Sequence, residues 1–177
     1  MKSLTHYIQE KLIIKKNKTT SYKYFPETKK ELKSIIKKRI KTEGNKADLN
    51  DIDVSNITDM SALFEGTDFN GDVSNWDVSN VTNMHGMFYW CDKFNQDISS
   101  WDVSNVKNMS FMFSHCNKFN QDISTWDVSN VTSMGEMFYG CKSFNQDISN
   151  WDVSSVADNY NIFEYCPIEK KYKPKFK

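Results

Sequence analysis

The chain has 177 residues, of which 38% are hydrophobic and 26% are charged, a length and composition that suit one domain with a sizeable core. Its 23 Lys and Arg residues balance its 23 Asp and Glu residues, so the formal net charge is zero. No apolar run reaches the roughly 20 residues of a transmembrane helix, which excludes a helical membrane span.

Residues 1–26 are predicted to form a basic, amphipathic leader. An apolar stripe at helical spacing opens the chain, and a polar, basic stretch follows it. Such a segment either docks on a partner or folds back onto its own domain, and we expect residues 1–14 to be a separable docking helix. The candidate docking residues are Leu4, Tyr7, Ile8 and Leu12.

Residues 27–46 are predicted to form a capping helix. Thr28 and Glu31 have the spacing of a capping box, and Gly44 ends the helical pattern. The helix precedes the repeats, so we expect it to shield their first unit from solvent. The alternative, a basic helix that binds nucleic acid, is less favoured. The apolar stripe consists of Leu32, Ile35, Ile36 and Ile40.

Residues 47–166 repeat with a period of 25, which is typical of an architecture in which each unit stacks on its copies. The unit is W-D-V-S-N-V-T-N-M-x-x-M-F-x-x-C-x-x-F-N-Q-D-I-S-x, and a degenerate copy precedes the first full one. The period is marked by Trp76, Trp101, Trp126 and Trp151, and by Cys91, Cys116, Cys141 and Cys166. Residues 167–177 lie beyond it as a basic C-terminal tail.

Each unit combines two apolar patterns. Residues 108–116 carry apolar side chains at i, i+3, i+4 and i+7, which predicts a short helix, whereas residues 96–101 suit a short strand. One strand and one helix per unit predict an α/β fold, a leucine-rich-repeat-like solenoid of about five coils whose strands pair in parallel about 4.8 Å apart. Phe88, Phe113 and Phe138 should then be nearly fully buried.

Residues at equivalent positions of successive units form columns along the stack, and some of these columns are polar. The column that contains Asn95 is predicted to bond the backbone of adjacent turns, and the column that contains Asp102 to form Asx-type turns. A second acidic column is a candidate site for a cationic partner, because stacked like charges repel and need compensation. Calcium is the less favoured alternative, since the unit has few glycines. This column contains Asp97, Asp122 and Asp147.

The cysteines are predicted to be buried, free thiols. Zinc ligands are paired two to four residues apart, whereas every interval here is 25, so we expect no metal and no cofactor. Four equivalent cysteines are also unlike a single activated nucleophile. We therefore expect no enzymatic activity.

Aperiodic residues, which differ from one copy of the repeat to the next, form the second candidate partner-binding site. Aromatic side chains at neighbouring surface positions are typical interface anchors. Residues 47–166 contain 4 Lys and Arg against 18 Asp and Glu, a net charge of −14, so we expect no nucleic-acid binding. The candidates are Tyr89, Trp90, Phe111, His115 and Tyr139.

The motif F-x-x-C-x-x-F-N-Q-D-I-S-x-W-D-V-S-N-V-T-N-M resembles the repeat of BspA-like leucine-rich-repeat surface proteins, which include Listeria- and Mycoplasma-type proteins. The resemblance implies a non-catalytic module for adhesion or protein binding at the cell surface. The sequence shows no secretion signal, lipid-accepting Cys or wall anchor. The alternative expectation is therefore a cytoplasmic protein, or a structural component or cargo of a phage particle.

Overall fold

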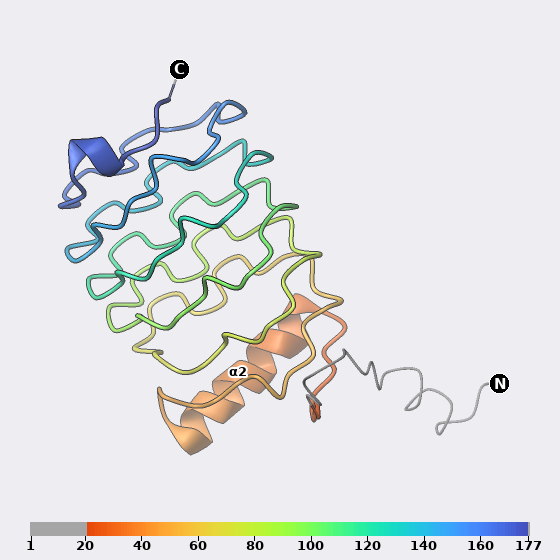
Figure 1. Ribbon diagram of the computed structural model, residues 1–177. Helices are drawn as coiled ribbons and strands as arrows, with labels where there is room; N and C mark the ends of the chain where they lie inside the picture. The colour runs from red at the N-terminus through yellow and green to blue at the C-terminus, as the bar shows by residue number, and fades with distance from the viewer. Residues whose placement is uncertain (1–20, 177) are drawn as a thin grey trace.

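The computed structural model describes residues 21–176. Within that range the helices are α2 (Lys29–Glu43) and the short 3-10 helix η1 (Lys170–Tyr172), and no residues form a regular strand. Between these helices the chain winds as coils that lie one above another, with α2 at one end of the stack and the C-terminal residues at the other (Figure 1). The repeat unit therefore corresponds to one coil.

The predicted α/β solenoid with leucine-rich-repeat-like coils is wrong, because the described coils contain neither helices nor strands. Residues 108–116, expected as a helix, include two left-handed residues, Phe111 (φ 59°) and His115 (φ 60°). Left-handed backbone interrupts a right-handed helix. Amide groups that would close helical turns donate instead to carbonyls of the next coil, from Met109, Phe111, Phe113 and His115.

The predicted strand at residues 96–101 is replaced by two successive turns. Asp97 accepts a hydrogen bond from the Ser99 N–H at 2.9 Å, and the Trp101 N–H donates to the Ile98 carbonyl at 3.1 Å. Adjacent coils of the repeat are joined elsewhere, by isolated parallel bridges rather than a sheet. These bridges are Asp59–Asn83, Asn83–Asn108, Asn108–Ser133 and Ser133–Asp158.

Stacked aromatic columns fill the interior. Phe88, Phe113 and Phe138 are each 0% exposed, which confirms their predicted burial, and their ring centroids are 5.7 Å apart along the stack. A second column packs against the first, and the ring centroids of Phe119 and Phe113 are 4.0 Å apart. Burial of one such side chain contributes about 1.5–3 kcal/mol, so these columns are a main source of stability.

Polar side chains tie the coils together at the edges of this core. The Trp126 Nε1–H donates to the Ile98 carbonyl of the preceding coil at 3.1 Å. Asn95 Oδ1 accepts the Asn120 N–H at 2.9 Å, and Asn120 Oδ1 accepts the Asn145 N–H at 3.0 Å. The predicted structural role of the Asn column is confirmed. These bonds satisfy backbone groups that the tight turns leave without a local partner.

Helix α2 covers the first coil, as its apolar stripe predicts. Thr28 Oγ1 accepts the Glu31 N–H at 3.2 Å, and Gly44 ends the helix with φ 85°. Leu32 and Ile36 belong to the buried core. Thr28 and Gly44 therefore set the bounds of a helix whose buried face is apolar.

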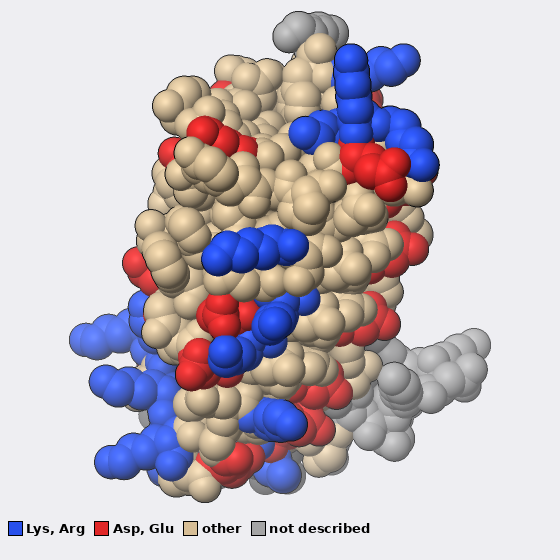
Figure 2. Space-filling model, turned by 90° about the vertical axis from the view of Figure 1, so that its left-hand side faces the viewer, with Lys and Arg blue, Asp and Glu red and all other residues tan. Residues whose placement is uncertain are grey.

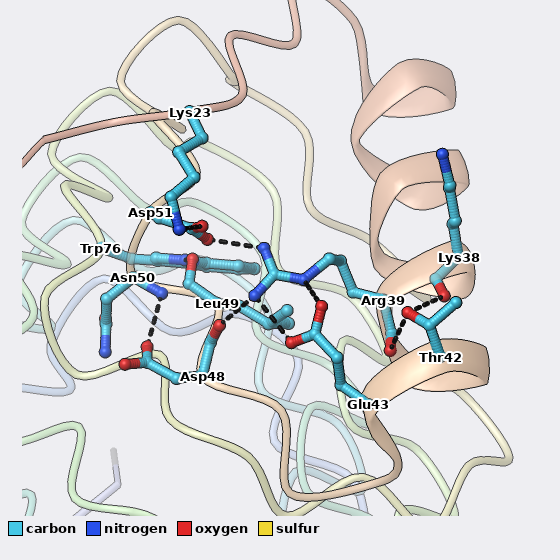
Figure 3. Close-up of polar contacts among 10 residues, drawn as sticks. All are labelled: Lys23, Lys38, Arg39, Thr42, Glu43, Asp48, Leu49, Asn50, Asp51 and Trp76. Atoms are coloured by element: carbon cyan, nitrogen blue, oxygen red, sulfur yellow. Dashed lines mark hydrogen bonds and ion pairs between the residues drawn. The ribbon is translucent and has the colours of Figure 1, made fainter.

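Arg39 fastens α2 to the first coil in a way that the sequence did not indicate. Its guanidinium donates to Asp51 Oδ1 at 2.7 Å, to the Asp48 carbonyl at 2.8 Å and to Glu43 Oε2 at 2.9 Å (Figure 3). Lys23 forms a salt bridge with the same Asp51 at 3.1 Å. All three guanidinium nitrogens of Arg39 therefore donate hydrogen bonds, which compensates for the burial of a side chain that is only 11% exposed.

Irregular segments complete both ends of the stack. Tyr24 makes a parallel bridge to Ile52, so the chain before α2 lies beside the first coil. At the other end, the Ile148 N–H donates to the Tyr172 carbonyl at 3.0 Å, and Ile168 is 4% exposed. Residues 167–176 therefore pack on the final repeat.

Candidate functional site

Aromatic side chains from successive coils meet on the outside of the stack. Trp90 stacks on His115 with 4.0 Å between ring centroids, Tyr89 contacts Phe111 at 5.9 Å, and His115 contacts Tyr139 at 5.3 Å. All five aperiodic candidates from the sequence are thus brought together. The connected set, here called the aromatic patch, consists of His85, Tyr89, Trp90, Phe111, His115, Tyr139 and Tyr165.

Several members of the aromatic patch occupy left-handed backbone positions. Trp90 (φ 57°), His115 (φ 60°) and Tyr165 (φ 55°) take one position of the coil, and Phe111 takes the other. Left-handed backbone costs a residue other than glycine about 1–2 kcal/mol. The aromatic residues are present despite that cost, which favours a role for their side chains. In the other coils these positions hold Gly66, Gly86 and Gly140, and also Ala62, Glu136 and Asn161.

His115 lies at the centre of the aromatic patch. Gly140 makes room for it, because a Cβ atom at that position would lie 2.9 Å from His115 Nδ1. Burial lowers the pKa of His115, and the positive charge of Lys142 lowers it further, whereas Glu136 opposes the shift. His115 is therefore neutral at pH 7 and contributes an aromatic surface rather than a positive charge.

Ser114 occupies the position that Tyr89 and Tyr139 hold in the two adjacent coils. It is 0% exposed, and its Oγ has no hydrogen-bond partner within residues 21–176. Its N–H makes the same turn hydrogen bond, at 3.1 Å, as that of the equivalent Tyr139, so the two Cβ atoms point in the same direction. A buried Ser thus separates two partly exposed Tyr residues at this position of the coil.

Two carboxylates border the C-terminal side of the aromatic patch. The Glu136 N–H donates to the Tyr160 carbonyl and the Gly140 N–H to the Glu164 carbonyl, both at 2.8 Å, which sets these residues side by side. Burial raises the pKa of Tyr139, and the neighbouring Tyr165, Glu164 and Glu136 raise it further. The carboxylates of Glu136 and Glu164 thus both act on the Tyr139 side chain.

The acidic column, Asp97, Asp122 and Asp147, is exposed on successive coils. Figure 2 shows Asp and Glu side chains along the right-hand edge of the stack and many Lys and Arg side chains towards its ends. Asp97 and Asp122 line a hollow of about 370 Å³ that contains no member of the aromatic patch. Whether this column binds a partner stays a prediction.

Hydrogen bonds within each coil offset the repulsion along the acidic column. The Ser124 N–H donates to Asp122 at 2.9 Å, and the Ser149 hydroxyl donates to Asp147 at 2.7 Å. These bonds lower the pKa of both carboxyl groups. The column that contains Asp102 makes the same turns, with the Ser104 hydroxyl 2.6 Å from Asp102, as predicted. Both acidic columns therefore stabilise turns.

The cysteine thiols are free, and Cys91, Cys116 and Cys141 are buried, whereas Cys166 is partly exposed. The Cys116 Sγ donates to the Phe88 carbonyl at 2.9 Å. Burial raises the pKa of Cys91 and of Cys166 to about 11. These thiols are protonated at neutral pH and are poor nucleophiles.

The described residues hold no group of three or more His, Cys, Asp or Glu side chains arranged to bind a metal ion. None of the helices between residues 21 and 176 has the length and apolar character needed to cross a bilayer. The candidate docking residues Leu4, Tyr7, Ile8 and Leu12 lie outside the described residues.

Sequence reasoning missed part of the site. Tyr160 and Tyr165, 67% and 70% exposed, lie in the last coil, where the repeat pattern has already weakened. An excess of aromatic residues at positions filled by glycine in other coils was the signal that could have identified Tyr165. Glu164 could have been found in the same way, because it replaces the Tyr of two earlier coils.

Comparison with known proteins gives one family. The family described as "Mycoplasma protein of unknown function, DUF285" matches residues 30–124 and residues 106–173, so its two matches span α2 and the coils. No curated protein matches the chain, and no solved structure matches it.

Proposed function

Because this chain belongs to the family described as "Mycoplasma protein of unknown function, DUF285", whose function is not known, we propose one from the surface of its coils. The protein is a non-catalytic protein-binding or adhesion module, and the aromatic patch is its binding surface. The observation that carries this proposal is the set of aromatic side chains at left-handed positions, including Trp90 at 51% exposure and Tyr165 at 70%.

The composition of the aromatic patch supports protein binding. Tyr and Trp are enriched where protein surfaces meet, because they bury a large area and lose little conformational freedom. The patch joins residues of consecutive coils, so it is an extended surface rather than a single anchor. Such a surface is suited to a protein partner.

The proposal of a non-catalytic role is supported by the chemistry of the reactive side chains. The thiols of Cys116 and Cys141 are buried, and burial raises the pKa of each well above its usual value. His115, one of the two histidines of the patch, is packed among the rings of Trp90 and Tyr139. These groups are better suited to packing than to nucleophilic chemistry.

The 25-residue motif also supports a closer relation to the BspA-like surface repeats, and with it a place at the cell surface. Localisation by antibody labelling of intact and permeabilised cells tests this part of the proposal. Labelling of intact cells is expected, and labelling only after permeabilisation would contradict it.

Binding through the aromatic patch is tested by comparative capture. The full chain, a Trp90→Gly/Tyr139→Ser variant and a Lys107→Ala control are used as baits in the same extract. The two replacements copy residues that other coils have at equivalent positions, Gly140 and Ser114. Proteins retained by the wild type and the control but lost from the variant are then purified, and their affinities measured.

At least a tenfold loss of affinity in the Trp90→Gly/Tyr139→Ser variant, with the control unchanged, is expected. Retention of every captured protein by all three baits would overturn the assignment of the aromatic patch.

A further inference from the structure

The C-terminal edge of the aromatic patch has a geometry of its own. Tyr139 and Tyr165 meet with ring planes at 87° and centroids 5.3 Å apart, so their faces form a right-angled corner. Tyr165 and Tyr160 are the most exposed large apolar side chains among residues 21–176, and the Tyr160 carbonyl accepts the Glu136 N–H at 2.8 Å. Glu136 and Glu164 lie beside this corner. These five residues are here called the aromatic corner.

The carboxylates of the aromatic corner differ in their pairing from those near α2. Within residues 21–176, neither Glu136 nor Glu164 takes part in a salt bridge or a side-chain hydrogen bond. By contrast, Glu43 and Asp51 at α2 are both paired with Arg39. The corner thus combines free negative charge with exposed aromatic faces.

Aromatic faces carry a negative electrostatic potential and attract cations that lie over them. A carboxylate at the same place adds a partner for hydrogen bonds from a guanidinium, whose planar shape also stacks on a ring. The charge of residues 47–166, with 4 Lys and Arg against 18 Asp and Glu, attracts basic chains over a longer range. The aromatic faces, the carboxylates and the net negative charge all favour a positively charged ligand, and the first two favour a guanidinium.

We infer that the aromatic corner binds an arginine side chain of a basic, extended peptide segment in the partner protein. The guanidinium stacks on Tyr165 or Tyr139 and donates hydrogen bonds to Glu164 or Glu136. This inference rests on the proposed function, because it names the partner chemistry that the aromatic patch recognises. It assigns recognition of a basic partner to the corner rather than to the acidic column.

The test uses the full chain and four probes: peptides of alternating Gly with Arg, Lys or citrulline, and maltoheptaose. Citrulline has the shape of arginine without its charge. Binding is followed by isothermal titration at low and physiological ionic strength. The Arg peptide should bind at least tenfold more tightly than the citrulline peptide, and binding should weaken as salt screens the charges.

Variants locate the bound peptide. Tyr165→Gly, which places the residue of the preceding coil at this position, and Glu164→Gln should each weaken Arg-peptide binding about two- to fivefold. The matched control is the triple replacement of Asp97, Asp122 and Asp147 by Asn, which should change affinity by less than either. Urea unfolding of every variant checks that the fold is retained.

Three results would overturn the inference: equal binding of the Arg and citrulline peptides, loss of binding in the Asp→Asn control with none in Tyr165→Gly, or binding of maltoheptaose alone. Its failure is distinguishable from that of the proposed function. If the Trp90→Gly/Tyr139→Ser variant still loses its captured partner, the aromatic patch remains a binding surface and only arginine recognition is refuted.

Discussion

The interior columns and the aromatic patch are both built from aromatic rings, but the interior residues recur in each coil whereas the patch residues vary between coils. In the interior, the same residue recurs in each coil, and Phe88, Phe113 and Phe138 stack on one another with no exposure. In the patch, equivalent positions hold different residues, such as Trp90 and Gly140. The interior positions are fixed by packing against their own copies, whereas the patch positions are free of that requirement.

Backbone energy separates the two regions further. Core residues such as Phe113 lie outside the left-handed region, while Trp90 and His115 are within it. The core therefore gains stability from its rings without this backbone cost, whereas the patch loses some stability to hold its rings outside. Replacements in the two regions should accordingly affect different measurements.

The largest expected effect is in the interior. Phe113→Ala removes a ring that contacts Phe88, Phe119 and Phe138, and the cavity adds to the lost burial. The free energy of unfolding should fall by about 3–5 kcal/mol. Urea unfolding measures this loss, and Lys107→Ala, an exposed residue of the same coil, is the control. A loss below about 1 kcal/mol would show that the columns do not support the stack.

The junction between α2 and the first coil should give a smaller effect. Arg39→Met leaves Asp51, whose side chain is 16% exposed, without its guanidinium partner. A charge-assisted hydrogen bond contributes about 1.5–3 kcal/mol, and a loss of that size is expected on urea unfolding. Lys38→Met, on the exposed side of α2, is the control and should cost little (Figure 3).

The pH dependence sharpens this test. Burial alone would raise the pKa of Asp51, but hydrogen bonds from Arg39 and Lys23 lower it below its usual 3.8. A lowered folded-state pKa gives stability that is complete above the unfolded pKa and is lost as the pH falls through the folded pKa. The wild type should therefore lose more stability below about pH 4 than Arg39→Met does. Equal losses would contradict a role for the Arg39–Asp51 pair.

The Asn column should contribute less than either. Asn120→Ala removes the acceptor for the Asn145 N–H and for Gln146 Nε2, both at 3.0 Å. Because Asn120 is exposed and water can replace these bonds, a loss of about 0.5–1.5 kcal/mol is expected. A comparable loss with Lys107→Ala would indicate that the hydrogen bonds contribute nothing specific.

Burial could be predicted from the sequence because it follows the period. The period alone predicts that Phe88, Phe113 and Phe138 are buried, and all three are 0% exposed. Helix α2 was predictable too, since Thr28 and Gly44 mark its ends. Each inference needed only local chemistry and the repeat.

Backbone conformation within the coil could not be predicted in the same way. The spacing of Met109, Met112, Phe113 and Cys116 fits one face of a helix, but it fits turns with left-handed residues equally well. A glycine in the sequence normally indicates a left-handed position, but in this coil Phe111 and His115 occupy those positions. The helix prediction failed for that reason.

The candidate site was only partly predictable. Aperiodicity identified Trp90 and Tyr139, but it could not show that their rings meet or that Glu136 lies beside them. Those contacts depend on which residues of adjacent coils are in register, and the backbone hydrogen bonds between coils set that register. Arg39 was missed because a basic residue within a Lys-rich helix gives no sign of burial.

The central claim is that residues repeated in each coil stabilise the stack, whereas residues that differ between coils bind the partner protein. Tyr139→Ser tests it most directly, because Ser is the natural residue at the equivalent position 114. Urea unfolding and affinity for the Arg peptide are measured on the same sample. The account predicts a stability loss below about 1 kcal/mol, within the range of lost ring contacts, with at least a threefold loss of affinity. A loss of several kcal/mol with unchanged affinity would contradict it.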